Sequence, residues 1–240
     1  MFVQDLKKKP IRDFVFPLGF LRDGKFELAG TAFFVGGQGV AVTAGHVVRE
    51  ITSEASPMGL FATDTSFEQI EILHAECHPT EDVGVVKLAG NWHSMIEVEP
   101  SVEHSSCRYQ LWGYPETVAH EIRRTATNQE DAASLVRPDL IYNEGYIRRR
   151  ISEQLPVSVF QGEAFYELSE VGGSCCSGAP IIRASRAVPG PWQAIGVYVG
   201  EETGRGPTSV GYATRSDALI EWRPSLLGAS LSEQKATIRS

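Results

Sequence analysis

The sequence predicts a mostly β fold, arranged as an all-β barrel or sandwich. Short apolar runs bounded by turn residues recur at regular spacing, and few segments show the period of an amphipathic helix. The chain has 240 residues and 42% hydrophobic content, so it can bury a substantial core in one large domain or two small ones. The formal net charge of −8 argues against nucleic acid as the main partner, and no apolar run approaches the roughly 20 residues that cross a bilayer.

The first hundred residues predict a series of hairpins. Two apolar runs flank Asp23-Gly24, a pair that favours a two-residue turn between antiparallel strands. Similar apolar runs follow it at short intervals. The strands predicted in this half are 14–21, 26–29, 31–35, 39–43, 67–73 and 83–88.

The second half repeats this pattern, interrupted by the polar stretch 116–139, which is interpreted as a partly helical surface insertion. Near the end, Ser216-Asp217 favours the start of a short helix, and Pro224 ends it. The polar residues after Gly228 are predicted to form a frayed tail. The strands predicted in this half are 108–113, 140–148, 157–168, 180–183, 192–199 and 210–213.

Three segments supply the residues of a nucleophilic site. They carry His46, Asp82 and Ser177, in that chain order. A serine hydroxyl becomes a good nucleophile when a positioned imidazole takes its proton, and a carboxylate can hold that imidazole in the required tautomer. Taken singly, each residue also has a structural interpretation, as a core histidine, a turn aspartate or a turn serine. Taken together, they predict acyl-transfer chemistry at Ser177.

Five segments resemble the chymotrypsin/trypsin-like serine proteases, especially the bacterial Deg/HtrA-type branch. The landmarks run from about residue 11 to residue 215, which is nearly the whole chain. The segments are Gly30-Thr31-Ala32-Phe33-Phe34-Val35, Thr43-Ala44-Gly45-His46-Val47-Val48, Asp82-Val83-Gly84-Val85-Val86-Lys87-Leu88, Gly113-Tyr114-Pro115 and Ser177-Gly178-Ala179-Pro180.

The resemblance implies a trypsin-like protease domain at residues 1–215, built from two packed six-stranded antiparallel β-barrels. The N-terminal barrel would span about 11–98 and the C-terminal barrel about 108–215, followed by a short helix and polar tail at 216–240. The implied function is that of a serine endopeptidase, which cleaves peptide or protein substrates through an acyl-enzyme. Such an enzyme needs no cofactor.

In the site that the resemblance implies, His46 is the general base, Asp82 orients it and Ser177 is the nucleophile. The backbone N–H groups of Ser177 and Cys175 would form the oxyanion hole. The family favours glycine at the position of Cys175. A side chain there resists a positive φ at a cost of roughly 1–2 kcal/mol, which would leave the hole unformed until substrate binds.

The same resemblance places Val171 at the base of the primary specificity pocket. Val171 offers no partner for a cation, and burying an unpaired charge is costly. Small or medium apolar residues are therefore expected before the cleaved bond. A shift of the loop by one residue would bring Glu170 or Gly172 to this position, and Glu170 would reverse the preference.

Other residues near the motifs have chemistry of their own. Cys176 does not directly precede the loop glycine, so it is interpreted as a loop thiol and not as the nucleophile. Glu81 is predicted to face solvent. The stretch His74-Ala75-Glu76-Cys77-His78 offers at most three ligands, fewer than the four of a closed structural zinc site, so no metal is predicted.

The four cysteines are predicted to be free thiols and the first residues lack an apolar signal core, so the expected location is the cytoplasm, without a membrane partner. No Ile/Val-Gly-Gly sequence is found near the start, so activation is expected to be constitutive or gated by a loop or a regulatory protein partner. A catalytically weak, protease-shaped binding module is the alternative function, motivated by Cys175. An esterase on the same barrels is a weaker third option.

Overall fold

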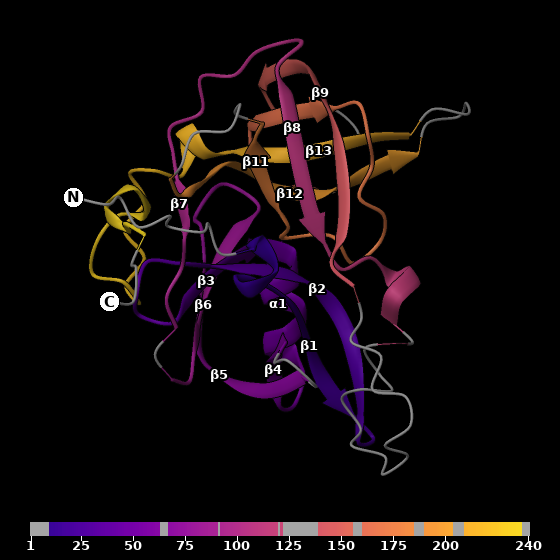
Figure 1. Cartoon of the computed structure of the whole chain (residues 1–240), viewed down its shortest axis with the longest axis vertical. Coiled ribbons are helices and arrows are strands. Elements are labelled where there is room, and N and C mark those ends of the chain that lie inside the picture. The colour runs from indigo at the N-terminus through magenta and orange to yellow at the C-terminus, as the bar shows by residue number, and fades with distance from the viewer. Residues whose placement is uncertain are drawn as a thin grey trace, which may run out of the picture.

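The computed structural model describes most of the chain, and its strands form two β-barrels packed one against the other (Figure 1). The prediction of a double barrel is confirmed. Within the described part of the chain, no helix is long and apolar enough to span a bilayer. The described residues are 10–62, 67–90, 92–119, 121, 139–155, 160–184, 190–203 and 209–236.

The first barrel is a closed antiparallel sheet with the strand order β1-β2-β3-β6-β5-β4. Its first hairpin has the predicted two-residue turn, in which Asp23 and Gly24 have positive φ values of 52° and 72°. Positive φ at both positions gives a turn whose twist matches that of the flanking strands. The elements are η1 (Ile11–Asp13), β1 (Val15–Arg22), β2 (Lys25–Val35), β3 (Val40–Ala44), α1 (Gly45–Ser53), β4 (Pro57–Ala62), β5 (Phe67–Cys77) and β6 (Val83–Leu88).

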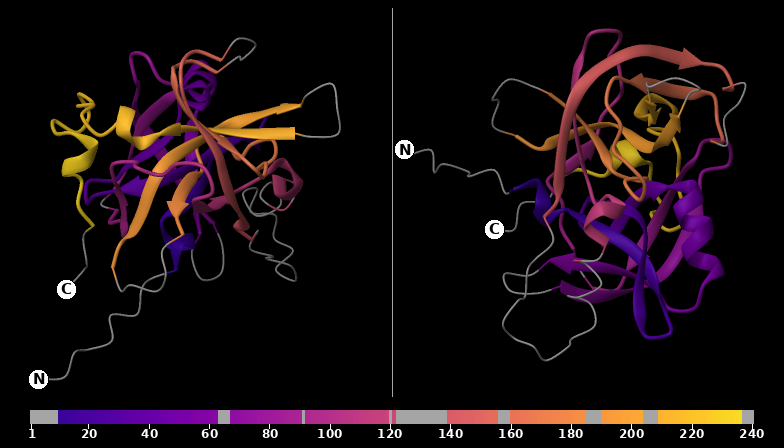
Figure 2. Two further views of the ribbon diagram at one scale, coloured as in Figure 1. Left: turned by 90° about the horizontal axis from the view of Figure 1, so that it is seen from above. Right: turned by 90° about the vertical axis from the view of Figure 1, so that its right-hand side faces the viewer.

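The second barrel has the strand order β11-β8-β9-β10-β13-β12 and is closed by the pairing of β11 with β12. A further strand, β7, pairs in parallel with the start of β12. The orange pair of strands in Figure 2 is β12 with β13, which projects from this barrel. The elements are β7 (Ile96–Val98), β8 (Arg108–Gly113), η2 (Glu116–Val118), β9 (Ile141–Ser152), β10 (Ala164–Leu168), β11 (Pro180–Arg183), β12 (Trp192–Thr203) and β13 (Ser209–Arg215).

Strand β10 begins at Ala164, so residues 160–163 of the strand predicted at 157–168 are not part of it, and residues 157–159 lie outside the described residues. The N–H groups of Glu163 and Ala164 each donate to Glu81 Oε2 at 3.3 Å. Glu81 is only 7% exposed, so the prediction that it faces solvent is wrong. Its carboxylate caps the start of a strand of the second barrel and thereby joins the two barrels.

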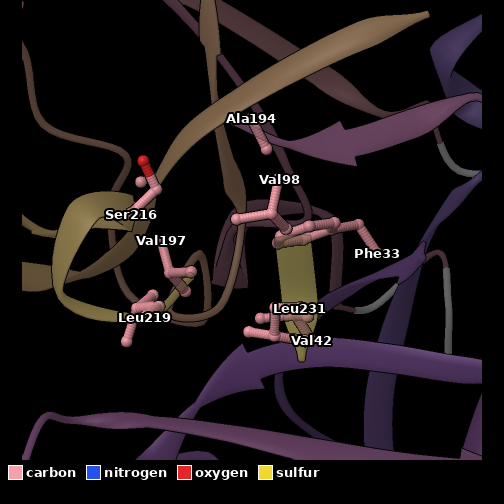
Figure 3. Close-up of a pocket in the computed structure, with 9 residues that line it drawn as sticks. Phe33, Val42, Val98, Ala194, Val197, Ser216, Leu219 and Leu231 are labelled. Carbon is pink, nitrogen blue, oxygen red and sulfur yellow. The ribbon is translucent and has the colours of Figure 1, made fainter. Parts of the chain in front are cut away.

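The seam between the barrels is apolar and tightly packed. Phe33 and Val42 of the first barrel meet Val197 of the second, together with Leu219 and Leu231 from the C-terminal segment (Figure 3). The space among these side chains is too small for a water molecule. Close packing of this kind favours a fixed arrangement of the two barrels.

The C-terminal segment differs from the predicted helix and frayed tail. After β13, the described residues, which end at 236, contain as helical elements only two single 3-10 turns, η3 (Ser216–Ala218) and η4 (Leu231–Glu233). Ser230 and Glu233 form a capping box around η4, and Leu231 is fully buried in the seam. The frayed tail is therefore a wrong prediction up to residue 236, because one buried leucine anchors a stretch of polar composition.

The insertion predicted at 116–139 is described only at its ends. The 3-10 turn η2 begins it, and Val118 and Ala119 are buried. Residues 120 and 122–138 lie outside the described residues, so the predicted helical content stays a prediction.

Candidate active site

Helix α1 presents His46 at its N-terminal end, directly after β3. The first amides of a helix lack partners within the helix, and here the His46 N–H donates to Asp82 Oδ1 at 2.8 Å. A Cβ atom added at Gly45 would lie 2.9 Å from that oxygen. The glycine therefore leaves room for the carboxylate to cap the helix, which fixes the backbone of His46.

The Asp82 carboxylate also binds the imidazole ring. Its Oδ2 lies 2.7 Å from His46 Nδ1, and its side chain is only 1% exposed. A carboxylate accepts hydrogen bonds, so Nδ1 carries the proton and Nε2 is the basic nitrogen of the neutral ring. Asp82 thus holds His46 in one tautomer and one orientation.

A third donor on this carboxylate is Arg49, one turn further along α1. Its Nη2 donates to Asp82 Oδ1 at 3.0 Å, and its Nη1 donates to Gln161 Oε1 at 3.4 Å. The guanidinium compensates the charge of a buried carboxylate whose burial would otherwise be costly. Sequence reasoning missed Arg49, although a helix starting at residue 45 places it three residues after His46, on the same face.

Ser177 lies in a tight turn between β10 and β11 that is held against the first barrel. The Thr31 N–H of β2 donates to the Ser177 carbonyl at 2.8 Å. At Gly178, whose φ is +92°, a Cβ atom would lie 2.0 Å from the Thr31 carbonyl oxygen and 2.1 Å from Thr43 Oγ1. Only glycine permits this close approach of the two barrels, which explains why a glycine follows Ser177 in the sequence.

His46 and Ser177 line the same cavity, whose volume is about 620 Å³. The Ser177 hydroxyl donates to the Val199 carbonyl at 3.1 Å and, among the described residues, makes no hydrogen bond with His46. The structure therefore places His46 and Ser177 at one cleft, with Asp82 buried behind His46 and the serine hydroxyl turned toward β12. The other residues lining the cavity are Leu28, Ala29, Glu50, Phe160, Gly173, Ser174, Cys175, Val199, Gly200 and Glu201.

The backbone at Cys175 adopts the conformation that its side chain disfavours. Its φ is 67°, in the left-handed region where glycine is the usual residue. Thr31 Oγ1 donates to the Cys175 carbonyl at 3.3 Å. Within the described residues, the Ser177 N–H has no acceptor. The turn thus has the conformation of a glycine turn despite the cysteine.

Cys176 is buried and does not line the cavity. Burial, with smaller effects from Cys175 and Glu201, raises the pKa of the Cys176 thiol to about 12. A thiol that stays protonated at neutral pH is a poor nucleophile, in keeping with its interpretation as a loop thiol. All four cysteines are unbridged.

Val171 is half-buried but is not among the residues that line the cavity. Its carbonyl accepts a hydrogen bond from Asn143 Nδ2 at 3.4 Å. Two acidic residues, Glu50 and Glu201, are among the described residues that line the cavity, and sequence reasoning missed both. Glu50 is four residues after His46 on α1, so helical spacing was a signal for it. Glu201 had no local signal.

No protein-family model and no curated protein matches the chain. Solved structures do match it. The protease domain of MamO from Magnetospirillum magneticum, in its apo form, superposes with a TM-score of 0.62 at 14% identity, covering 88% of this chain and 95% of that one. The fold is that of trypsin-like protease domains.

Two further structures share this trypsin-like fold. Rv3671c from M. tuberculosis, solved as a mutant in an inactive form, gives a TM-score of 0.58 at 14% identity, covering 85% of this chain and 82% of that one. The HtrA-type protease AlgW with a decapeptide gives a TM-score of 0.62 at 13% identity, covering 88% of this chain and 63% of that one. Identities this low show a shared fold alone.

Proposed function

We propose that the protein is a serine endopeptidase that cleaves peptide bonds through an acyl-enzyme on Ser177. The observation that carries the proposal is the hydrogen bond of 2.7 Å between His46 Nδ1 and the buried Asp82 carboxylate, at a cavity that Ser177 also lines. That hydrogen bond leaves Nε2 as the nitrogen that accepts a proton.

In the proposed reaction, His46 Nε2 takes the hydroxyl proton of Ser177 while Oγ attacks the carbonyl carbon of the substrate. The tetrahedral intermediate collapses, the C–N bond breaks and His46 gives the proton to the leaving amine. Water then attacks the acyl-enzyme by the same route, which releases the acid and restores Ser177. The hydroxyl first turns from the Val199 carbonyl toward His46, by rotation about one side-chain bond.

The N–H groups of Ser177 and Cys175 are the proposed donors to the oxyanion. The Ser174 carbonyl accepts from the Glu116 N–H at 2.8 Å. In a trans peptide the N–H points opposite to the C=O, so this bond directs the Cys175 N–H away from Glu116. The left-handed backbone at Cys175 costs roughly 1–2 kcal/mol. One oxyanion donor typically raises the rate by 10²–10³, which corresponds to about 3–4 kcal/mol of transition-state stabilisation. The gain from the donor is therefore larger than the cost of the backbone conformation.

A peptide is the proposed substrate class. AlgW, which shares the fold, was solved with a decapeptide. The cavity of about 620 Å³ beside Ser177 lies within the size range of ligand sites in proteins. The cytoplasm is the proposed location, supported by four unbridged cysteines. Cell fractionation followed by detection of the protein in the soluble or the membrane fraction tests that location.

An unbiased peptide library tests the proposal. Mass spectrometry should identify cleaved peptides after incubation with the wild-type protein, and Ser177→Ala should remove turnover by several powers of ten without unfolding the chain. Ser53→Ala, an exposed serine at the end of α1, serves as the control and should keep the wild-type rate. If folded Ser177→Ala keeps more than about a tenth of the turnover, Ser177 is not the nucleophile.

One observation favours a second function, that of a catalytically weak binding module with a protease fold. Ser177 donates to the Val199 carbonyl at 3.1 Å instead of to His46. If this arrangement persists with substrate bound, the base cannot take the proton. The module predicts that peptides bind equally well to the wild-type protein and to Ser177→Ala, and that neither protein cleaves them.

A further inference from the structure

A buried carboxylate oxygen without a partner lies beside the candidate nucleophile. Glu201 is on β12, two residues after Val199, and lines the same cavity as Ser177. Its Oε2 is buried and has no hydrogen-bond partner, and Glu201 has no ion pair within the described residues. A buried carboxylate oxygen without a hydrogen-bond partner is unfavourable. A cationic or hydrogen-bond-donating group that reached it would therefore be stabilised.

Glu201 interacts electrostatically with two buried side chains, Cys176 and Tyr198. Burial is the main reason why the pKa values of the Cys176 thiol and the Tyr198 hydroxyl are raised. The charge of Glu201 raises both pKa values further. The Tyr198 hydroxyl oxygen accepts from the Gly172 N–H at 2.9 Å, at the base of the turn that carries Ser177. Glu201 is therefore close to the turn and the strand that together enclose the cavity.

The next residue on the same strand points elsewhere. Glu202 acts electrostatically on Tyr212 and does not line the cavity. Adjacent side chains of a strand point to opposite faces, which accounts for the difference. Glu202 thus offers a control with the same charge, the same strand and the other face.

The cavity as a whole favours cations. Its described lining residues include the carboxylates of Glu50 and Glu201 and no lysine or arginine. Burial raises the pKa of Glu50, so its carboxyl group holds a negative charge less readily than that of an exposed glutamate. Clefts lined by one sign of charge attract ligands of the opposite sign.

We infer that Glu201 is the specificity-determining residue of this site and that it selects a cationic side chain, lysine or arginine, next to the cleaved bond. The statement that the cationic residue lies next to a cleaved bond rests on the proposed function, whereas the binding of a cationic side chain does not. Once the carboxylate turns toward the cavity, an ammonium or guanidinium group would give it the partner that Oε2 lacks, through a charge-assisted hydrogen bond. Val171, which was expected to set an apolar preference, does not line the cavity.

A panel of fluorogenic peptides that differ only in the residue before the cut tests this inference. The panel contains arginine, lysine, leucine, alanine and citrulline, which is the neutral isostere of arginine. The wild-type protein should cleave the arginine peptide about tenfold to hundredfold faster, in kcat/KM, than the citrulline peptide, since hydrogen bonds to charged groups contribute about 1.5–3 kcal/mol. Glu201→Gln should remove this ratio, and Glu202→Gln should retain it.

Calorimetry on Ser177→Ala separates specificity from catalysis. This variant should bind an uncleaved arginine peptide at least tenfold more tightly than its citrulline analogue, and the additional change Glu201→Gln should abolish the difference. If leucine or alanine peptides are cleaved as fast as the arginine peptide, or if Glu201→Gln keeps the arginine preference, the inference is overturned and the peptidase stands. If nothing is cleaved but the binding difference depends on Glu201, the cationic selectivity stands and the peptidase proposal fails.

Discussion

Asp82 binds helix α1 and the proposed catalytic base at the same time. Oδ1 accepts from the His46 N–H in the first turn of α1 and from Arg49, and Oδ2 accepts from the ring of His46. The carboxylate is 1% exposed, so water does not compete for these bonds. At the scale of single residues, this carboxylate determines where the imidazole lies and which of its nitrogens is basic.

Asp82→Asn tests that role directly. The asparagine amide group would donate to Nδ1, which places the ring proton on Nε2 and leaves no base for Ser177. We expect kcat/KM to fall by roughly three to four powers of ten at pH 7, with circular dichroism unchanged.

The adjacent carboxylate provides the matched control. Glu81→Gln keeps an oxygen acceptor for the Glu163 and Ala164 N–H groups and touches neither His46 nor Ser177. Its kcat/KM should stay within about threefold of the wild-type value, since nothing it loses acts on the reacting atoms. Equal activity of Asp82→Asn and the wild-type protein would show that Asp82 does not orient the base.

Whether a residue of the candidate site could be predicted from the sequence depends on whether its position is set by neighbouring residues or by contacts with distant segments. His46, Asp82 and Ser177 stand in local motifs whose neighbours, such as Gly45 and Gly178, are needed for close approach of the backbone. Local context is visible in a sequence. The burial of Glu81 and the position of Glu201 at the cavity depend instead on pairing between distant segments, so neither could be predicted without the topology.

The turn that carries Ser177 is the element whose geometry is most constrained. Gly178→Ala would bring a Cβ atom to 2.0 Å from the Thr31 carbonyl oxygen at a φ of +92°. We expect a loss of about 2–5 kcal/mol in the free energy of unfolding, measured by urea denaturation, from strain and overpacking together.

Gly228→Ala separates the effect of backbone strain from the effect of overpacking. Gly228 also has a positive φ, of +64°, but nothing lies within 4 Å of an added Cβ atom there. Only the backbone penalty of about 1 kcal/mol should remain. Equal losses for the two substitutions would mean that contact with the first barrel does not shape the turn.

The turn before Asp82 should respond to pH through His78. Its Nδ1 accepts from the N–H groups of Thr80 and Glu81 at 3.2 and 3.0 Å, and burial lowers its pKa. The folded-state pKa is thus below the unfolded-state value of about 6.5. As pH falls, the unfolded state binds the proton first, so the free energy of unfolding decreases below about pH 6.5 and levels off below the folded-state pKa.

His78→Asn should flatten this dependence, because asparagine keeps an acceptor for the turn and does not titrate. Urea midpoints of the wild-type and the variant, compared from pH 8 to pH 5, measure it. The prediction fails if both proteins lose the same stability over this range.

For the whole molecule, short apolar runs and turn signals predicted most of the strands, although not β4 or β7, and the resemblance predicted their closure into two barrels. The C-terminal segment was the exception. Its composition indicates a frayed tail, but Leu231 inserts between the barrels beside Leu219 and Val42 (Figure 3). A single anchoring contact of this kind has no periodic pattern, so only the packed structure reveals it.

Leu231→Ala measures how far this contact stabilises the molecule. A fully buried leucine truncated to alanine typically costs about 2–5 kcal/mol, and Leu231 lies at the seam of both barrels. We expect such a loss in urea denaturation, with one cooperative transition. Leu73→Ala is the control, because Leu73 is 45% exposed and its truncation should change stability by less than about 0.5 kcal/mol.

The measurement that tests the central proposal most directly is covalent labelling by a fluorophosphonate, which reacts with an activated serine. The wild-type protein should take up one label per chain, and peptide mass spectrometry should locate it on Ser177. Ser177→Ala should take up none, and His46→Gln should be labelled at least a hundredfold more slowly, because the base is missing. Folded wild-type protein that stays unlabelled, or that carries the label on another residue, would contradict the assignment of Ser177 as an activated nucleophile.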